Sequence, residues 1–179
     1  SFARFLSIVL HPVLMPTYAL YFLLHYSTYL AYTTQEHEKL ALYSIILLNT
    51  LLLPLLISYF LLRRGWIHSF EMEKKEERII PFISNAILLM IAYYMMRELL
   101  LPNIFDLLIL GAAAAVVLAV IINLKWKISI HMIGIGGIVG TFFGLSTFML
   151  VDLRTPILFC LLLAGLLGSA RLTLGAHQP

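Results

Sequence analysis

The chain has 179 residues, of which 61% are hydrophobic and only 12% are charged, and its formal net charge is +3. A water-soluble domain carries about twice that share of charged residues, so the composition excludes an ordinary soluble globular protein. The small positive charge is no argument for nucleic-acid binding, because the basic residues gather at the ends of apolar runs, where lipid phosphates also lie.

Several apolar runs follow one another along the chain. They cover about residues 2–26, 40–62, 79–97, 105–124, 131–151 and 156–168. Runs near the roughly 20 residues that a bilayer core requires, continuous rather than alternating in polarity, predict transmembrane helices and not a β-barrel. The first run is interrupted by His11-Pro12 and Pro16, which predicts a bend or a short interfacial segment. The second contains Pro54, a predicted kink.

Small residues mark the fifth run. Gly136, Gly140 and Gly144 recur at four-residue spacing, which predicts a close approach of another helix. The single cysteine, Cys160, lies inside the sixth run and cannot form an intrachain disulfide. We therefore expect an all-α, polytopic membrane bundle of about six transmembrane helices.

The polar segments between the runs alternate between the two sides of the membrane. Those after the second, fourth and sixth helices share one face. They are residues 63–78, 125–131 and 171–177. The opposite face receives residues 35–39, 97–98 and 152–154, whose mixed charges are typical of solvated turns.

Arg171 and His177 lie six positions apart where the last apolar run ends. An arginine can hold a phosphate through a planar fork of donors, and a neutral imidazole can attack phosphorus. The spacing resembles the third signature of the type 2 phosphatidic acid phosphatases, which is a serine-arginine pair, five residues and a histidine. Ser169 stands one position too early for that pattern, because Ala170 precedes the arginine.

The second signature of that family is proline-serine-glycine-histidine. Ser129 and His131 occupy its serine and histidine positions, whereas Ile128 and Ile130 replace the proline and the glycine. In a helix, Lys127 and His131 would share a face at four-residue spacing.

The first signature is a lysine, six residues and an arginine-proline pair. Arg78 is the best match for its arginine, although Pro81 comes three positions later and Glu71 holds the expected lysine position. Lys74 or Lys75 is the substitute for that lysine. The resemblance covers roughly residues 74–177.

The resemblance implies a division of roles. His177 would attack phosphorus and form a phosphohistidine, and His131 would protonate the leaving oxygen, with no metal or other cofactor. The phosphate ligands would be Arg171, Arg78, Ser129, Lys127 and Lys75. The family's orienting aspartate would fall four positions after His177, so we expect the natural chain to continue past Pro179.

Residues 1–179 are thus expected to form a single integral membrane phosphatase-like domain that hydrolyses a lipid phosphate. Phosphatidate, phosphatidylglycerol phosphate, undecaprenyl pyrophosphate and lipid A phosphate are all candidates, and the oligomeric state is left open. The alternative is a non-catalytic membrane protein that binds or transports an anionic lipid or phosphate, which the imperfect first and second signatures favour.

Simpler interpretations exist for the individual residues. A basic side chain at a helix end commonly reaches to lipid headgroups, and His131 alone fits an interfacial packing role as well as a chemical one. His11 precedes a proline and is interpreted as structural. The expected localisation is the cell membrane. The positive-inside tendency puts the basic face in the cytoplasm, whereas the resemblance puts it on the outer side, and we expect the outer side.

Overall fold

The computed structural model describes residues 2–26, 29–70, 72, 74, 76–126 and 128–175. All regular elements in these residues are helical. Six candidate spans are long and apolar enough to cross a membrane: Phe2–His25, Glu36–Arg63, Glu76–Arg97, Ile104–Asn123, Ile130–Phe148 and Arg154–Thr173. The predicted all-α membrane architecture is confirmed.

The chain groups into two compact units, each of which is described by itself. The terminal unit contains residues 1–19 and 129–179, and the central unit contains residues 20–128. Helix α2 (Met15–His25) begins in the terminal unit and continues into the central one.

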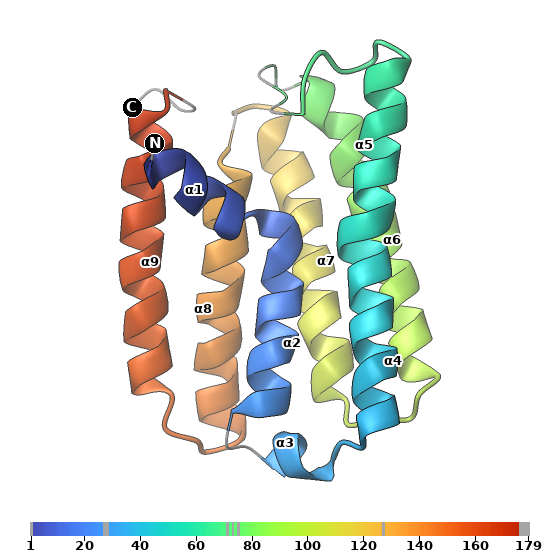
Figure 1. The fold of residues 1–179 in the computed structure, drawn as a ribbon, viewed down its shortest axis with the longest axis vertical. Helices are drawn as coiled ribbons and strands as arrows, with labels where there is room; N and C mark the ends of the chain where they lie inside the picture. Colours follow the sequence, from blue (N-terminus) through green and yellow to red (C-terminus); the bar gives the residue numbers. More distant parts are fainter. Residues whose placement is uncertain are drawn as a thin grey trace. The chain divides into compact units, whose positions relative to one another are not determined.

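Besides the start of α2, the described residues of the terminal unit form four helical elements (Figure 1). They are α1 (Phe2–Val9), the short 3-10 helix η1 (Pro12–Leu14), α8 (Ile130–Phe148) and α9 (Arg154–Thr173). Helices α8 and α9 run antiparallel, so the start of α8 and the end of α9 lie at the same end of the unit. Helix α1 lies obliquely against α9, and η1 packs against α8.

The break between α1 and η1 is at the predicted place. His11 has extended backbone angles, with φ −69° and ψ 136°, because the ring of Pro12 disfavours a helical conformation in the residue before it. The backbone N–H of Val13 donates to Nδ1 of His11 over 3.4 Å, which caps η1. The proline therefore ends α1, and the histidine side chain starts the next element.

Among the glycines that the structure describes in the terminal unit, Gly134 has the tightest surroundings. A Cβ added to Gly134 would lie 2.9 Å from Cγ of Met15 and 3.2 Å from Cα of Pro12. A Cβ added to Gly136, Gly140 or Gly144 would meet no atom of the described residues within 4 Å. The close contact therefore falls two residues before the predicted glycine series.

We expect Gly134→Ala to destabilise the protein by about 1–3 kcal/mol, since the new methyl group overpacks the contact with Pro12. Gly136→Ala is the matched control, because its methyl group meets no described atom and alanine favours a helix by about 1 kcal/mol over glycine. Thermal unfolding in detergent would measure both. A midpoint for Gly134→Ala equal to that of Gly136→Ala would contradict this interpretation of the packing.

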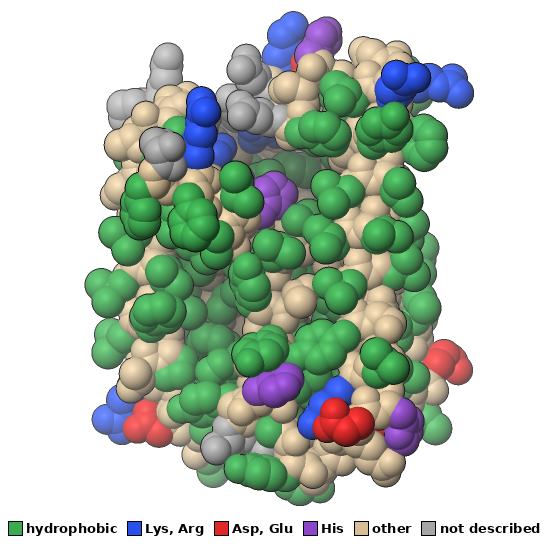
Figure 2. Space-filling view, in the orientation of Figure 1, with side chains coloured by type: hydrophobic (Ala, Val, Ile, Leu, Met, Phe, Trp, Pro, Cys, Tyr) green, Lys and Arg blue, Asp and Glu red, His purple; other side chains and the backbone are tan. Residues whose placement is uncertain are grey.

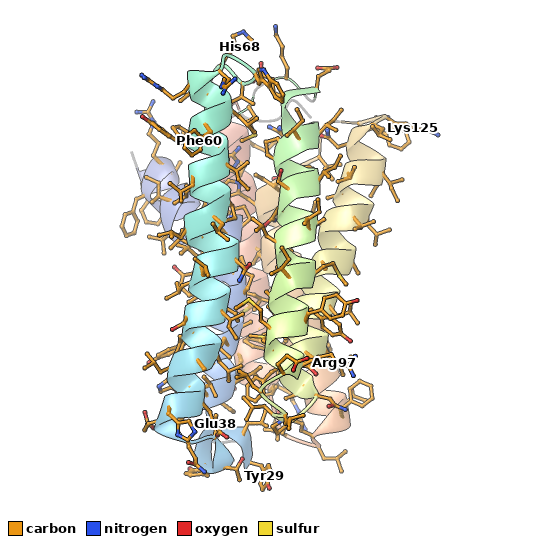
Figure 3. The ribbon with its side chains drawn as sticks, turned by 90° about the vertical axis from the view of Figure 1, so that its right-hand side faces the viewer. Tyr29, Glu38, Phe60, His68, Arg97 and Lys125 are labelled. Carbon is orange, nitrogen blue, oxygen red and sulfur yellow. The ribbon has the colours of Figure 1, made fainter. Side chains whose placement is uncertain are left out.

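The central unit holds the remaining helices (Figure 3). They are α3 (Tyr29–Thr33), α4 (Glu36–Ile46), the π-helix η2 (Leu47–Leu52), α5 (Leu53–Arg63), the 3-10 helix η3 (Glu76–Arg78), α6 (Ile79–Arg97) and α7 (Ile104–Asn123). In Figure 3, His68 and Lys125 lie at one end of this unit, and Glu38 and Arg97 lie at the other. The predicted alternation of sides therefore holds within the central unit.

The irregularity predicted at Pro54 takes the form of the π-helix η2, which ends two residues before the proline. A proline within a helix has no N–H to donate, and its ring crowds the carbonyl four residues earlier. Wider π turns accommodate such a mismatch. In the same turns Asn49 is buried, and its Nδ2 donates to the carbonyl oxygen of Ile45 over 2.9 Å.

Exposed apolar side chains mark the lipid-facing surfaces. On α6, the exposed residues Ile83, Ile87 and Ile91 recur at four-residue spacing and so form one stripe along the helix. Figure 2 shows apolar side chains over the middle of the helices and charged side chains near the helix ends. This pattern is what a helix surrounded by acyl chains requires.

Candidate functional site

His131 is the central residue of the candidate site. It lies in the first turn of α8 with only 5% of its surface exposed. Its Nε2 lies 3.1 Å from the backbone carbonyl oxygen of Ser7 on α1. A carbonyl oxygen can only accept a hydrogen bond, so Nε2 is the nitrogen that donates. In a neutral His131 ring, the lone pair is therefore on Nδ1.

His11 lies beside His131 in the terminal unit. The two ring centroids are 5.2 Å apart, and the ring planes meet at 80°, an edge-to-face arrangement. Because Nδ1 of His11 accepts from Val13, a neutral His11 carries its proton on Nε2. The backbone thus sets the same tautomer in both neutral rings, with the proton on Nε2 and the lone pair on Nδ1.

Arg171 belongs to the same cluster. It lies half-buried in the last turn of α9, and its charge interacts with His11. The end of α9 is held against the start of α8, since a Cβ on Gly168 would touch Sδ of Met132 at 3.7 Å. Arg171 lies three residues after Gly168, and His131 directly precedes Met132. His131 and Arg171, 40 positions apart in the sequence, therefore both lie at the end of the unit where α8 begins and α9 ends.

The segment around Arg171 differs from the prediction in one respect. The sequence analysis ended the last helix at about residue 168, whereas α9 continues to Thr173. The residues after Gly168, such as Ala170, Arg171 and Leu172, are compatible with a helix, and Thr173 bonds back to the carbonyl oxygen of Ala170 over 2.9 Å. The arginine is thus presented by a rigid helix rather than by a loop.

Two serine residues lie close to His131. Ser129 precedes it by two positions in the chain, and Ser7 contacts it through a backbone carbonyl. Ser129 is the N-cap of α8, and Ser7 supplies the carbonyl that binds His131. The Oγ atoms of both are buried, and neither has a hydrogen-bond partner among the described residues. A buried hydroxyl without a partner costs about 1–3 kcal/mol, and such a cost is common where a site is built to receive a polar ligand.

Arg78 lies in the central unit and is almost fully buried, with 4% of its surface exposed. Its Nε donates to the carbonyl oxygen of Met72 over 2.8 Å, and its Nη1 donates to that of Ile128 over 3.0 Å. These bonds tie η3 to the segment that leads toward α8. Its neighbour Glu77 accepts a hydrogen bond from Nδ1 of His68 over 2.8 Å. The burial of Arg78 was not predicted, because one of its partners, the carbonyl of Ile128, is 50 positions away in the sequence.

The predicted site residues therefore fall into three groups. His131, Ser129 and Arg171 belong to the terminal unit, where the ring of His11 meets that of His131 and interacts with the charge of Arg171. Arg78 belongs to the central unit. His177, Lys127 and Lys75 lie outside the described residues, so their roles stay predictions. The sequence analysis interpreted His11 as structural, and the signal that could have marked it was a histidine-proline pair inside an apolar run.

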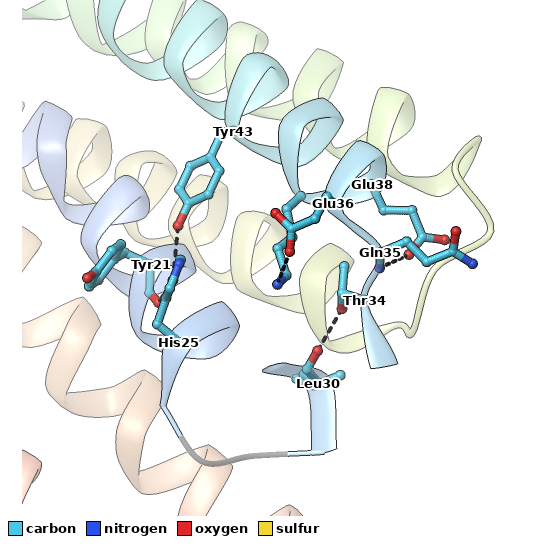
Figure 4. A network of polar contacts seen from close by, with 9 residues as sticks. Tyr21, His25, Leu30, Thr34, Gln35, Glu36, Glu38 and Tyr43 are labelled. Carbon is cyan, nitrogen blue, oxygen red and sulfur yellow. Dashed lines mark hydrogen bonds and ion pairs between the residues drawn. The ribbon is translucent and has the colours of Figure 1, made fainter. Parts of the chain in front are cut away.

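The opposite end of the central unit carries polar contacts of another kind (Figure 4). Nδ1 of His25 lies 3.0 Å from the carbonyl oxygen of Tyr21 and 3.5 Å from the hydroxyl of Tyr43. Glu38 accepts from the backbone N–H of Gln35 over 2.7 Å, as a helix cap does. These contacts are mostly local caps and turns, as expected for that end.

The donor types of the terminal-unit cluster are imidazole, hydroxyl and guanidinium, which suit an anion with several oxygens. Among the described residues, no group of three or more His, Cys, Asp and Glu side chains is arranged to hold a metal ion. Comparison of the chain with protein-family models, with curated proteins and with solved structures found no match.

Proposed function

We propose that this chain is a membrane lipid phosphate phosphohydrolase that acts through a phosphohistidine. The observation that supports the proposal best is the cluster around His131. A buried imidazole with one nitrogen bound to Ser7 lies next to a second imidazole, and an arginine charge interacts with the latter. Proton transfer and charge stabilisation, both needed in phosphoryl transfer, are available from these groups.

The position of the cluster in the helices favours a lipid substrate. His131 is in the first turn of the span Ile130–Phe148, and Arg171 is in the last turn of the span Arg154–Thr173. Helix ends of this kind lie at the level of the headgroups, whereas the middle of each span lies among the acyl chains. A lipid in the bilayer would bring its phosphate to these residues while its chains stay between or beside the helices.

The proposed reaction has two steps. His177 attacks phosphorus, the bond between phosphorus and the ester oxygen breaks, and His131 gives a proton to the leaving oxygen to form the lipid alcohol. His131 starts this step as the imidazolium. Because Nε2 keeps its proton in the bond to the carbonyl of Ser7, Nδ1 delivers its proton and the ring becomes neutral. Water then attacks the phosphohistidine and releases inorganic phosphate. Arg171 stabilises the negative charge in both steps.

A non-catalytic protein that binds an anionic lipid is the second candidate. It is favoured by Arg78, which directs two of its donors to backbone carbonyls and so has fewer left for a phosphate. Such a protein would bind phosphatidate without releasing phosphate from it.

We place the active face on the outer side of the cell membrane. The positive-inside tendency is judged from the number of lysines and arginines in the loops on each side of the membrane. The basic residues of the proposed site would be present to bind substrate, so they should not count toward this number. Labelling of a His68→Cys variant in intact cells with a membrane-impermeant thiol reagent tests this orientation, with His37→Cys as the opposite-side control. If position 37 were labelled and position 68 were not, the active face would lie on the cytoplasmic side.

Phosphate release from phosphatidate by the purified protein tests the proposed function. We expect release by the wild type and none above background in His177→Ala or His131→Ala. The proposal would be wrong if the wild type and both variants turned over phosphatidate equally. Binding of phosphatidate without release would support the second candidate.

A further inference from the structure

The roles proposed above leave His11 without a function beyond capping η1. Three contacts fix its position in the terminal unit. Its Nδ1 accepts from Val13, its ring meets the ring of His131 edge to face, and its neighbour Pro12 is packed against Gly134, three residues after His131. The side chain is therefore held at a defined place beside the proposed general acid.

Nε2 is the ring nitrogen of His11 that can bind a partner other than Val13. Because Nδ1 accepts the Val13 N–H, a neutral ring must donate through Nε2. The charge that interacts with His11 belongs to Arg171, which the proposed function assigns to the phosphate. The ring that carries this donor meets the proposed general acid and interacts with the charge of the phosphate-binding arginine, so the donor suits a phosphoryl oxygen held by those two groups.

Helix α1 supplies a second group to the same place. The carbonyl oxygen of Ser7 binds His131, and the chain from Ser7 to His11 covers the end of α1 and the break after it. The α1–η1 segment, residues 2–14, thus contacts His131 of α8 through both Ser7 and His11. Because Pro12 disfavours a helical backbone in the residue before it, His11 has extended backbone angles and does not continue α1.

We propose that His11 is a further phosphate-binding residue, which donates from Nε2 to a nonbridging oxygen of the substrate phosphate. The α1–η1 segment is then one wall of the site. This inference rests on the proposed function, since it takes the same phosphate as its ligand. The class of ligand is a phosphate monoester or diphosphate carried by a lipid.

Two substitutions separate this role from the structural cap. The side-chain oxygen of asparagine takes the place of Nδ1, so His11→Asn keeps the acceptor for Val13 and loses the donor at Nε2. The side-chain nitrogen of glutamine reaches the place of Nε2, so His11→Gln keeps the donor and loses the cap. If His11 were only a cap, His11→Asn would retain more activity than His11→Gln. If His11 binds phosphate, His11→Gln would retain more activity than His11→Asn.

The test is hydrolysis of phosphatidate by purified wild type and both variants, with inorganic phosphate as a competitive inhibitor. We expect His11→Asn to keep the wild-type unfolding midpoint, to lower kcat/KM by about 10–100-fold, and to raise the Ki of phosphate by a similar factor, as loss of a hydrogen bond to a charged ligand does. His11→Gln is expected to retain more activity than His11→Asn despite a lower midpoint.

Wild-type kcat/KM and Ki in His11→Asn, together with an inactive His131→Ala, would overturn the role of His11 and leave the proposed function intact. Absence of turnover in the wild type would overturn both. The two failures are therefore distinguishable in one set of measurements.

Discussion

Replacing His131 with glutamine is expected to lower kcat for phosphate release from phosphatidate by about 10²–10⁴-fold, the range that a positioned general acid contributes. The glutamine side-chain N–H takes the place of Nε2–H and keeps the bond to the carbonyl of Ser7, so the terminal unit should stay folded. What is lost is the proton on Nδ1. A lower kcat in His131→Gln would therefore reflect the loss of proton transfer and not a change in packing.

A substrate with a better leaving group is the control for this interpretation. An aryl phosphate leaves without full protonation of its oxygen, so the deficit of His131→Gln should be much smaller with that substrate than with phosphatidate. Kinetics with both substrates measure the difference. Equal deficits on the two substrates, or wild-type kcat on phosphatidate, would contradict the role of His131 as general acid.

Replacing Arg171 with alanine is expected to lower kcat/KM by about 10³-fold or more, because an arginine that stabilises the charge of a transferring phosphoryl group contributes on that scale. Arg171→Lys should recover only part of the activity, since an ammonium group does not reproduce the planar fork of donors. Steady-state kinetics with phosphatidate would give both values.

Helix α9 offers a matched control at its other end. The side chain of Arg154 is 87% exposed and its Nε lies 3.4 Å from a carboxylate oxygen of Asp152. Such an exposed pair contributes little to stability. Arg154→Ala should therefore stay within about twofold of wild-type kcat/KM. If Arg154→Ala and Arg171→Ala were equally active, Arg171 would have no specific part in phosphate chemistry.

The sequence was sufficient for the parts of the fold that depend on local chemistry. Apolar runs of bilayer length located the six spans, and the pyrrolidine rings of Pro12 and Pro54 located the two irregularities. The end of α9 was missed, because Arg171 and Thr173 looked like the start of a polar loop although their backbone remains helical. Helix ends are set by caps and by packing as much as by polarity.

The contacts within the site depend on long-range packing. The carbonyl of Ser7 and the imidazole of His131 are 124 positions apart in the chain, so no spacing rule predicts their hydrogen bond. His11 looked structural because its own neighbours, Pro12 and Val13, explain it. The partners of Gly134 could not be predicted for the same reason, since Pro12 and Met15 come from the other end of the sequence.

Detection of phosphate covalently bound to the protein tests the central claim most directly. Purified protein would be mixed with phosphatidate labelled in its phosphate and denatured in alkali after a single turnover, because phosphohistidine survives base and is lost in acid. We expect labelled wild-type protein and unlabelled His177→Ala. Turnover without label in the wild type, or equal label in His177→Ala, would contradict a phosphohistidine at that position.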